Sequence, residues 1–181
     1  NISANTVGSN WFQVYCYKDQ DITLDLISRA KKANYQAIVL TVDVPLMAKR
    51  ERDDINRFSL PAEICAANLK NYHCEANLLN QANSSAIKLF TNKQFREDLS
   101  WNDIAWVKKH CELPLILKGI LRESDIHRAI EHGAQAVIIS NHGGRQLDGS
   151  CSTIEALAKI ANKDSITIPL LLDGGIRRGT D

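Results

Sequence analysis

Apolar and polar positions alternate in two ways along most of this chain. Segments with apolar residues at helical spacing begin near Asp21, Ser100, Glu123 and Thr153. Between them lie short apolar runs with the β-branched and aromatic content of strands, at residues 11–15, 37–42, 113–117, 136–141 and 168–172. The alternation predicts five strand-helix units and therefore a parallel sheet.

Two α/β architectures fit this pattern, an open doubly wound sheet and a (β/α)8 barrel. No GxGxxG motif follows the first strand, which weakens the dinucleotide-binding version of the doubly wound sheet. At the boundaries, Asp21 is the expected N-cap of the first helix and Gly133 the expected stop after the helix over 123–132. Lys118 and Gly119 are expected to form a loop after the third strand.

The segment 45–99 interrupts the regular alternation. It opens with a charged cluster at 49–54 and continues with Asn-rich sequence that has no sustained period. Long irregular insertions in compact domains are commonly lids or disordered segments. We therefore predict a single domain over 1–181 that contains an irregular, mobile insertion at 45–99, lying over the mouth of the site.

Charge and composition narrow the classes of function. Among 181 residues, 22 Lys and Arg face 21 Asp and Glu, so the net charge of +1 gives no reason to expect nucleic acid or an anionic membrane as partner. Five scattered cysteines without metal-ligand spacing indicate reduced thiols in a cytoplasmic protein and no metal site. The chain lacks an initiating Met and stops where a helix near Arg177 should begin, so we expect a longer parent protein.

Each predicted strand ends in polar or charged residues. Because the carboxyl ends of parallel strands meet at one edge in either architecture, these side chains should share a site. Taken singly, each has a simpler interpretation as strand surface, helix cap or solvated charge, and it is their agreement that favours a shared site. In chain order they are Gln13 and Tyr15, Thr41 and Asp43, Lys118, then Ser140, His142 and Arg145, and finally Asp173, Gly175 and Arg177.

The stretch SNHGGRQLD, residues 140–148, combines groups suited to catalysis. A histidine can serve as a base near neutral pH, paired glycines allow backbone to approach a ligand, and the planar fork of Arg145 matches a carboxylate. The stretch thus predicts a general base beside an anion clamp. The alternative is a tight turn in which His142 caps a helix or faces solvent.

The turn DGGIRRG, residues 173–179, has the features of a phosphate site. Gly174 and Gly175 would expose amide donors, and a helix starting near Arg177 would point its positive end at a bound anion. This predicts a cofactor that carries a phosphate. The alternative is a plain glycine-rich turn with a basic helix face.

These motifs together resemble the FMN-dependent L-2-hydroxy acid oxidases and dehydrogenases, which include glycolate oxidase, lactate oxidase and mandelate dehydrogenase. The resemblance covers nearly all of residues 11–181, and SNHGGRQLD and DGGIRRGTD in this order are its most specific parts. It implies a (β/α)8 TIM barrel, of which this chain would supply about five β/α units with a long loop insertion.

The resemblance also implies roles for the residues at the strand ends. His142 resembles the catalytic base and Asp43 the carboxylate that holds its imidazole, while Tyr15, Arg50 and Arg145 match the residues that bind the substrate. The expected FMN contacts are Lys118 beside flavin N1, Gln13, Thr41 and Ser140 on the isoalloxazine ring, and Asp173, Gly175 and Arg177 on the ribityl chain and phosphate.

The implied reaction is oxidation of a small L-2-hydroxy acid, such as lactate or glycolate, to the 2-keto acid. Oxygen, a quinone or a cytochrome would accept the electrons, and a quinone would place the protein at the inner face of the membrane. We expect a homo-oligomer for the full-length protein. The family's opening strands, eighth strand and second phosphate-binding loop lie outside this sequence, so we expect the isolated chain to bind FMN weakly and to be inactive.

Two other functions fit parts of the pattern. Another FMN barrel enzyme, such as an isomerase, would not need the set formed by His142, Arg145 and Arg50. A non-catalytic barrel fragment would bind only a flavin, a phosphate or a partner.

Overall fold

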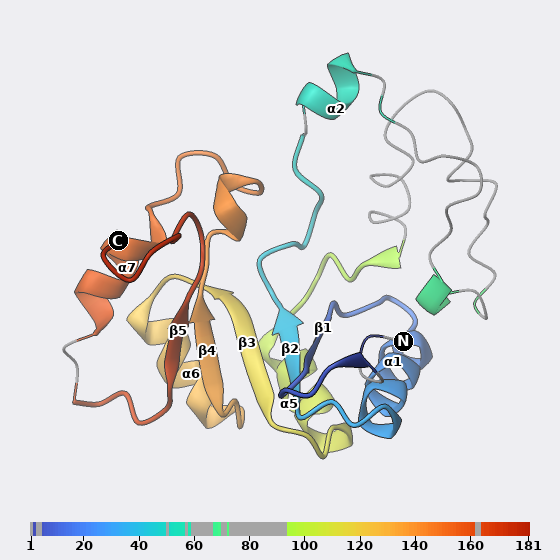
Figure 1. Cartoon of the computed structure of the whole chain (residues 1–181). Helices are drawn as coiled ribbons and strands as arrows, with labels where there is room; N and C mark the ends of the chain where they lie inside the picture. The colour runs from blue at the N-terminus through green and yellow to red at the C-terminus, as the bar shows by residue number, and fades with distance from the viewer. Residues whose placement is uncertain are drawn as a thin grey trace.

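The computed structural model describes residues 2, 5–49, 51–56, 58, 67–69, 72, 94–161 and 164–181. All five predicted strands are present, as are the four helices predicted from apolar spacing (Figure 1). The strands are β1 (Trp11–Val14), β2 (Ala37–Thr41), β3 (Leu115–Ile120), β4 (Ala136–Ile139) and β5 (Leu170–Leu172). The helices are α1 (Gln20–Lys32), α2 (Glu51–Ile55), η2 (Ala67–Leu69), α5 (Trp101–His110), α6 (Glu123–Glu131), η3 (His142–Gly144) and α7 (Thr153–Ile160).

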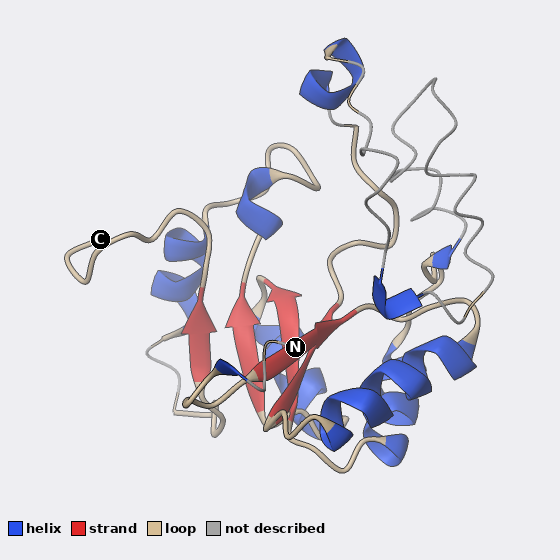
Figure 2. Ribbon diagram, turned by 45° about the vertical axis from the view of Figure 1, so that its right-hand side comes forward, coloured by secondary structure: helices blue, strands red, loops and turns tan. Residues whose placement is uncertain are grey.

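The strands form one parallel sheet in the order β1-β2-β3-β4-β5, which is also their order in the chain. A doubly wound sheet reverses its strand order at a switch point, whereas consecutive units of a barrel add strands in one direction. No reversal occurs among these five strands, so the sheet is an arc of a (β/α)8 barrel. Figure 2 shows the strands as red arrows whose direction changes from one edge of the sheet to the other.

The two faces of the sheet have different surroundings. One face packs with α1, α5, α6 and α7 in a single large core that includes Ile38, Leu40, Leu117 and Val137. The other face holds a small cluster built from Ala37, Val39, Ile116 and Ala136, to which the described helices contribute no residue. This second face corresponds to the interior of a barrel, because the helices of that fold lie on the outside.

Strand register brings polar side chains together at the carboxyl ends on the interior face. Gln13 pairs with Val39, and Thr41 pairs with Lys118 two positions further along. Alternate residues of a strand point to the same face, so all four lie on the side of the small cluster. The polar ends of β1, β2 and β3 therefore face the barrel interior.

Two predicted boundaries are wrong. Lys118 and Gly119 lie inside β3 rather than in a loop, with a register shift between Lys118 and Ile120 that admits the positive φ of Gly119. The first helix is capped by Asp19, whose side chain accepts from the Asp21 backbone N–H. The predicted start at Ser100 and stop at Gly133 agree with α5 and α6.

The predicted helix near Arg177 is also wrong within this chain. Residues 173–181 form bends and a turn, and Asp181 Oδ2 accepts hydrogen bonds from the backbone N–H groups of Arg177 and Arg178, each at 2.8 Å. A side-chain carboxylate thus takes the donors that a helix start would leave open.

Most of the predicted insertion at 45–99 lies outside the described residues, so its predicted mobility and its place over the mouth of the site stay predictions. Its last part rejoins the barrel, since Lys18 N–H donates to the Gln94 carbonyl and Phe95 forms an antiparallel bridge with Tyr17. Among the described residues, no helix has the length and apolar character needed to cross a membrane.

Candidate active site

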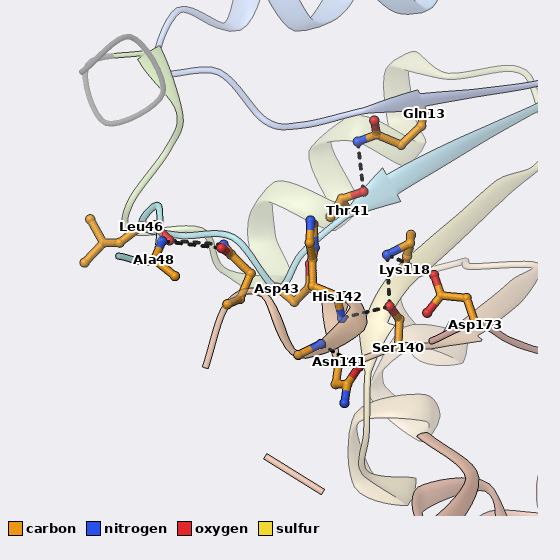
Figure 3. A network of polar contacts seen from close by, with 12 residues as sticks. Gln13, Thr41, Asp43, Leu46, Ala48, Lys118, Ser140, Asn141, His142 and Asp173 are labelled. Atoms are coloured by element: carbon orange, nitrogen blue, oxygen red, sulfur yellow. Dashed lines mark hydrogen bonds and ion pairs between the residues drawn. The ribbon is translucent and has the colours of Figure 1, made fainter. Parts of the chain in front are cut away.

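A histidine and an aspartate from two different strand ends form the centre of the site. Nδ1 of His142, in η3 after β4, lies 3.0 Å from Oδ1 of Asp43, which follows β2 by two residues (Figure 3). Their side chains are 20% and 14% exposed. A carboxylate oxygen accepts hydrogen bonds, so Nδ1 of His142 is assigned as the donor, and in the neutral ring the free lone pair is then on Nε2. The arrangement leaves one ring nitrogen available as a base.

The backbone at His142 adopts an unusual conformation that orients the ring. Its φ is +58°, a left-handed value uncommon for residues other than glycine. The His142 N–H donates to Oγ of Ser140 at 3.1 Å, and Asn141 accepts from the Gly144 N–H through its side chain at 3.2 Å. These local bonds hold the turn, which carries the imidazole toward Asp43 rather than into solvent.

Lys118 is the cation of the site. Its ammonium donates to Oγ of Ser140 at 2.9 Å and lies 3.2 Å from Oδ2 of Asp173, so residues from β3 and from the ends of β4 and β5 meet there (Figure 3). Ser140 is fully buried and links Lys118 to the His142 backbone through one hydroxyl. The cation and the base therefore belong to one hydrogen-bonded network.

A second polar pair lies at the ends of β1 and β2. Nε2 of Gln13 donates to Oγ1 of Thr41 at 2.9 Å, and Thr41 pairs in register with Lys118 (Figure 3). Thr41 is buried, whereas Gln13 is exposed on the interior face. The pair continues the polar edge from the cation to the first strand.

Two buried carboxylate oxygens of this site accept no hydrogen bond within the part of the chain that the structure describes. They are Oδ2 of Asp43 and Oδ1 of Asp173. Buried acceptors without a donor cost about 1–3 kcal/mol each, which is uncommon outside functional sites. Both oxygens are therefore suited to receive donors from a bound molecule.

The other predicted residues are less closely joined to this network. Arg145 is exposed on the loop after His142, and the ring of Tyr15 stacks on Phe95 with a centroid separation of 4.4 Å. Arg50 lies outside the described residues.

The predicted phosphate turn has exposed backbone and an oxyanion at its amides. Gly175 is exposed with positive φ and Arg177 is exposed as well, while the Asp173 carbonyl accepts from Oγ1 of Thr153 at 2.6 Å. The two backbone donors of Arg177 and Arg178 hold the pKa of the Asp181 carboxyl below its usual value. This turn thus stabilises negative charge, as a phosphate site must.

Three residues that support the site were not singled out from the sequence. Asn141 caps the turn of η3, Gly119 leaves room for Asp43, and Gln146 bonds to the backbone of residues 46 and 48. A glycine between Lys118 and a strand end could have indicated a close approach. The contacts of Gln146 span about a hundred positions and leave no local signal in the sequence.

The fold and the site define a (β/α) barrel protein with a histidine–aspartate pair and a partly buried lysine at the carboxyl ends of its strands. A family model for FMN-dependent dehydrogenases matches residues 1–181, and the chain belongs to this family. The resemblance seen in the sequence is thereby confirmed.

Individual relatives agree with this assignment. An L-lactate oxidase of Nostoc sp. is 44% identical over 171 residues, which are 94% of this chain and 47% of that protein. A glycolate oxidase of Spinacia oleracea is 40% identical over 181 residues, 99% of this chain and 48% of that protein. A crystal structure of mandelate oxidase with (S)-4-hydroxymandelic acid superposes with a TM-score of 0.89 at 41% identity, covering 98% of this chain and 49% of that one. The chain spans about half the length of the relatives it matches.

Proposed function

We propose that the protein containing this chain oxidises an (S)-2-hydroxy acid to the 2-keto acid with FMN as cofactor. The observation that carries the proposal is the 3.0 Å contact between His142 and Asp43, on the same edge of the sheet as the partly buried cation Lys118. Similar chains named lactate, glycolate and mandelate oxidase support it. A non-catalytic fragment would need neither the oriented imidazole nor its carboxylate.

In this proposal, His142 removes a proton from the substrate through Nε2. Asp43 fixes the tautomer through Nδ1 and stabilises the imidazolium that forms, because the carboxylate lies against the ring in a partly buried setting. The hydrogen bond between His142 and Asp43 is kept during this step, and the proton ends on Nε2 of His142.

The residues present fit FMN. Lys118 would lie beside N1 of the ring system, Gln13, Thr41 and Ser140 would bond its polar edge, and the buried Oδ1 of Asp173 would accept from a ribityl hydroxyl. Gly175 and Arg177 would contact the phosphate. When bound, FMN supplies the chemistry that accepts the two electrons of the oxidation.

Substrate binding in this proposal uses the cations near the base. Arg145 lies on the same exposed loop as Gly149. Together with Arg50 it would pair with the substrate carboxylate, and Tyr15 would hydrogen-bond the substrate. A bidentate guanidinium would fix which hydrogen and hydroxyl of the hydroxy acid face the cofactor and His142.

The acceptor, assembly and location are extensions of the same proposal. We propose oxygen as electron acceptor, because the similar proteins carry the name oxidase. A single barrel domain, a homo-oligomer and a cytoplasmic location remain predictions.

Anaerobic mixing of the full-length protein with L-lactate, glycolate or (S)-mandelate tests the function. At least one of these acids should bleach the flavin absorbance and yield one keto acid per flavin, while (R)-lactate and (R)-mandelate should not. A flavin that stays oxidised with all three would refute the proposal.

A further inference from the structure

Gln146 joins the loop that carries His142 to the loop that carries Asp43. Its Oε1 accepts a hydrogen bond from the Ala48 backbone N–H at 3.3 Å, and its Nε2 donates to the Leu46 carbonyl at 3.2 Å. Figure 3 marks these contacts at Leu46 and Ala48. One amide side chain thereby pairs with the backbone of a second loop much as a neighbouring strand would.

The bridge lies close to the catalytic pair on both sides. Gln146 follows His142 by four residues, and Leu46 follows Asp43 by three, with the fixed φ of Pro45 between them. A shift of one loop against the other at Gln146 would therefore reach the 3.0 Å contact through only a few residues.

We propose that Gln146 is a positioning residue that sets the distance between Asp43 and His142. The inference rests on the proposed function, because it assigns Gln146 to the geometry of that base. Glutamine suits the task, since its planar amide supplies one acceptor and one donor at fixed separation. Methionine, with similar length, supplies neither strong donor nor acceptor, so Gln146→Met removes the bridge while keeping the side-chain volume.

A second glutamine, directly before β4, provides a matched control. Oε1 of Gln135 accepts from Lys108 Nζ at 2.9 Å and from the Leu115 N–H at 3.3 Å, at the amino end of β3. Gln135→Met therefore removes comparable contacts at the opposite edge of the barrel from the site. Any general effect of the substitution on folding will appear in both variants.

The experiment measures flavin reduction by the hydroxy acid in single turnovers of the full-length protein. Gln146→Met should slow reduction about tenfold or more, because small displacements of catalytic groups have large effects on rate. FMN content should not change, since Gln146 touches none of the proposed cofactor contacts. Gln135→Met should stay within about twofold of the wild type. Equal rates for Gln146→Met and wild type would overturn the proposal.

A double-mutant cycle separates positioning from an independent role. In an Asp43→Asn background, Gln146→Met should slow reduction by no more than about twofold further, because the pair that it positions is already broken. A full additional loss would show that Gln146 acts elsewhere, for example through Arg145, and would overturn the assignment.

Hydrogen exchange keeps this inference distinct from the proposed function. If no hydroxy acid reduces the flavin of the wild-type protein, the proposed function is refuted. The hydrogen bonds of Gln146 are tested separately, by the exchange rate of the Ala48 backbone amide. Gln146→Met should accelerate exchange of that amide, and Gln135→Met should not. Unchanged exchange at Ala48 in Gln146→Met would overturn the bridge.

Discussion

Gly119 leaves the space that the side chain of Asp43 fills. A Cβ atom on Gly119 would lie 2.5 Å from Cβ and 2.6 Å from Cγ of Asp43, far inside van der Waals contact. The φ of +109° at Gly119, allowed by the register shift in β3, brings the strand this close to the loop after β2. The position of the Asp43 carboxylate thus depends on a residue without a side chain in the neighbouring strand.

Gly119→Ala should therefore reduce turnover about tenfold or more, because Asp43 must move away from His142. Gly133→Ala is the matched control, since Gly133 also has positive φ, but a Cβ there would meet only the flexible side chain of Lys108 at 3.1 Å. Both variants should lose on the order of 1 kcal/mol of unfolding free energy. Urea denaturation would measure the loss of stability, and steady-state kinetics the turnover. Comparable turnover in the two variants would contradict the steric argument.

Arg145→Lys should raise the KM for the hydroxy acid about tenfold or more, because an ammonium cannot reproduce the bidentate contact and a charge-assisted bond is worth about 1.5–3 kcal/mol. Steady-state kinetics with two or more hydroxy acids would measure the change in KM. Arg29→Lys is the control, since Arg29 bonds to Asp25 on the outer helix α1. A KM that stays at the wild-type value for every acid would mean that Arg145 faces solvent.

Lys118→Met should lower the reduction potential of the bound flavin, because it removes the cation from the site and leaves Asp173 without its 3.2 Å partner. A lost charge-assisted contact corresponds to about 30–60 mV for a two-electron couple. Redox titration of the full-length protein would measure the shift. Lys108→Met, at the other end of the sheet, should leave the reduction potential unchanged. An equal shift in that variant would contradict the assignment of Lys118 as the cation beside the flavin.

The cysteines should differ strongly in reactivity. Burial raises the pKa of the Cys16 thiol to about 12 and also raises that of Cys111, whereas Cys151 is exposed. The thiolate is the reactive form, and a thiol with a pKa of about 12 is ionised only about one part in ten thousand at pH 8. Iodoacetamide at pH 8 should therefore label Cys151 well before Cys16, with mass spectrometry of peptides as the readout. In urea the difference should vanish; early labelling of Cys16 in the folded protein would contradict its burial.

Much of the fold could be predicted from local patterns. The five strands are short, mostly apolar runs, and the helices between them have a clear apolar stripe, so both follow from side-chain spacing. The choice between the barrel and the doubly wound sheet could not be made this way, because both alternate strand and helix identically. Strand order alone decides it, and strand order depends on contacts between distant segments.

The site shows the same division. His142, Ser140 and Asp173 could be located because each follows a buried strand, and Asp43 was matched to His142 through the family resemblance. Lys118 was named as a site residue but placed in a loop, because Gly119 marks a bulge within β3 and not its end. Gln146 was missed, since its partners are backbone groups on another loop and no sequence pattern encodes such a bridge.

The central claim is that His142 is the base, and stopped-flow reduction of His142→Gln in the full-length protein tests it most directly. Glutamine keeps a polar side chain but cannot accept a proton near neutral pH, and a general base contributes about 10²–10⁴-fold to a rate. We expect FMN to remain bound, because the proposed cofactor contacts come from other residues, and its reduction by the hydroxy acid to slow by at least about a hundredfold. Reduction at nearly the wild-type rate would contradict the assignment of His142 as the base.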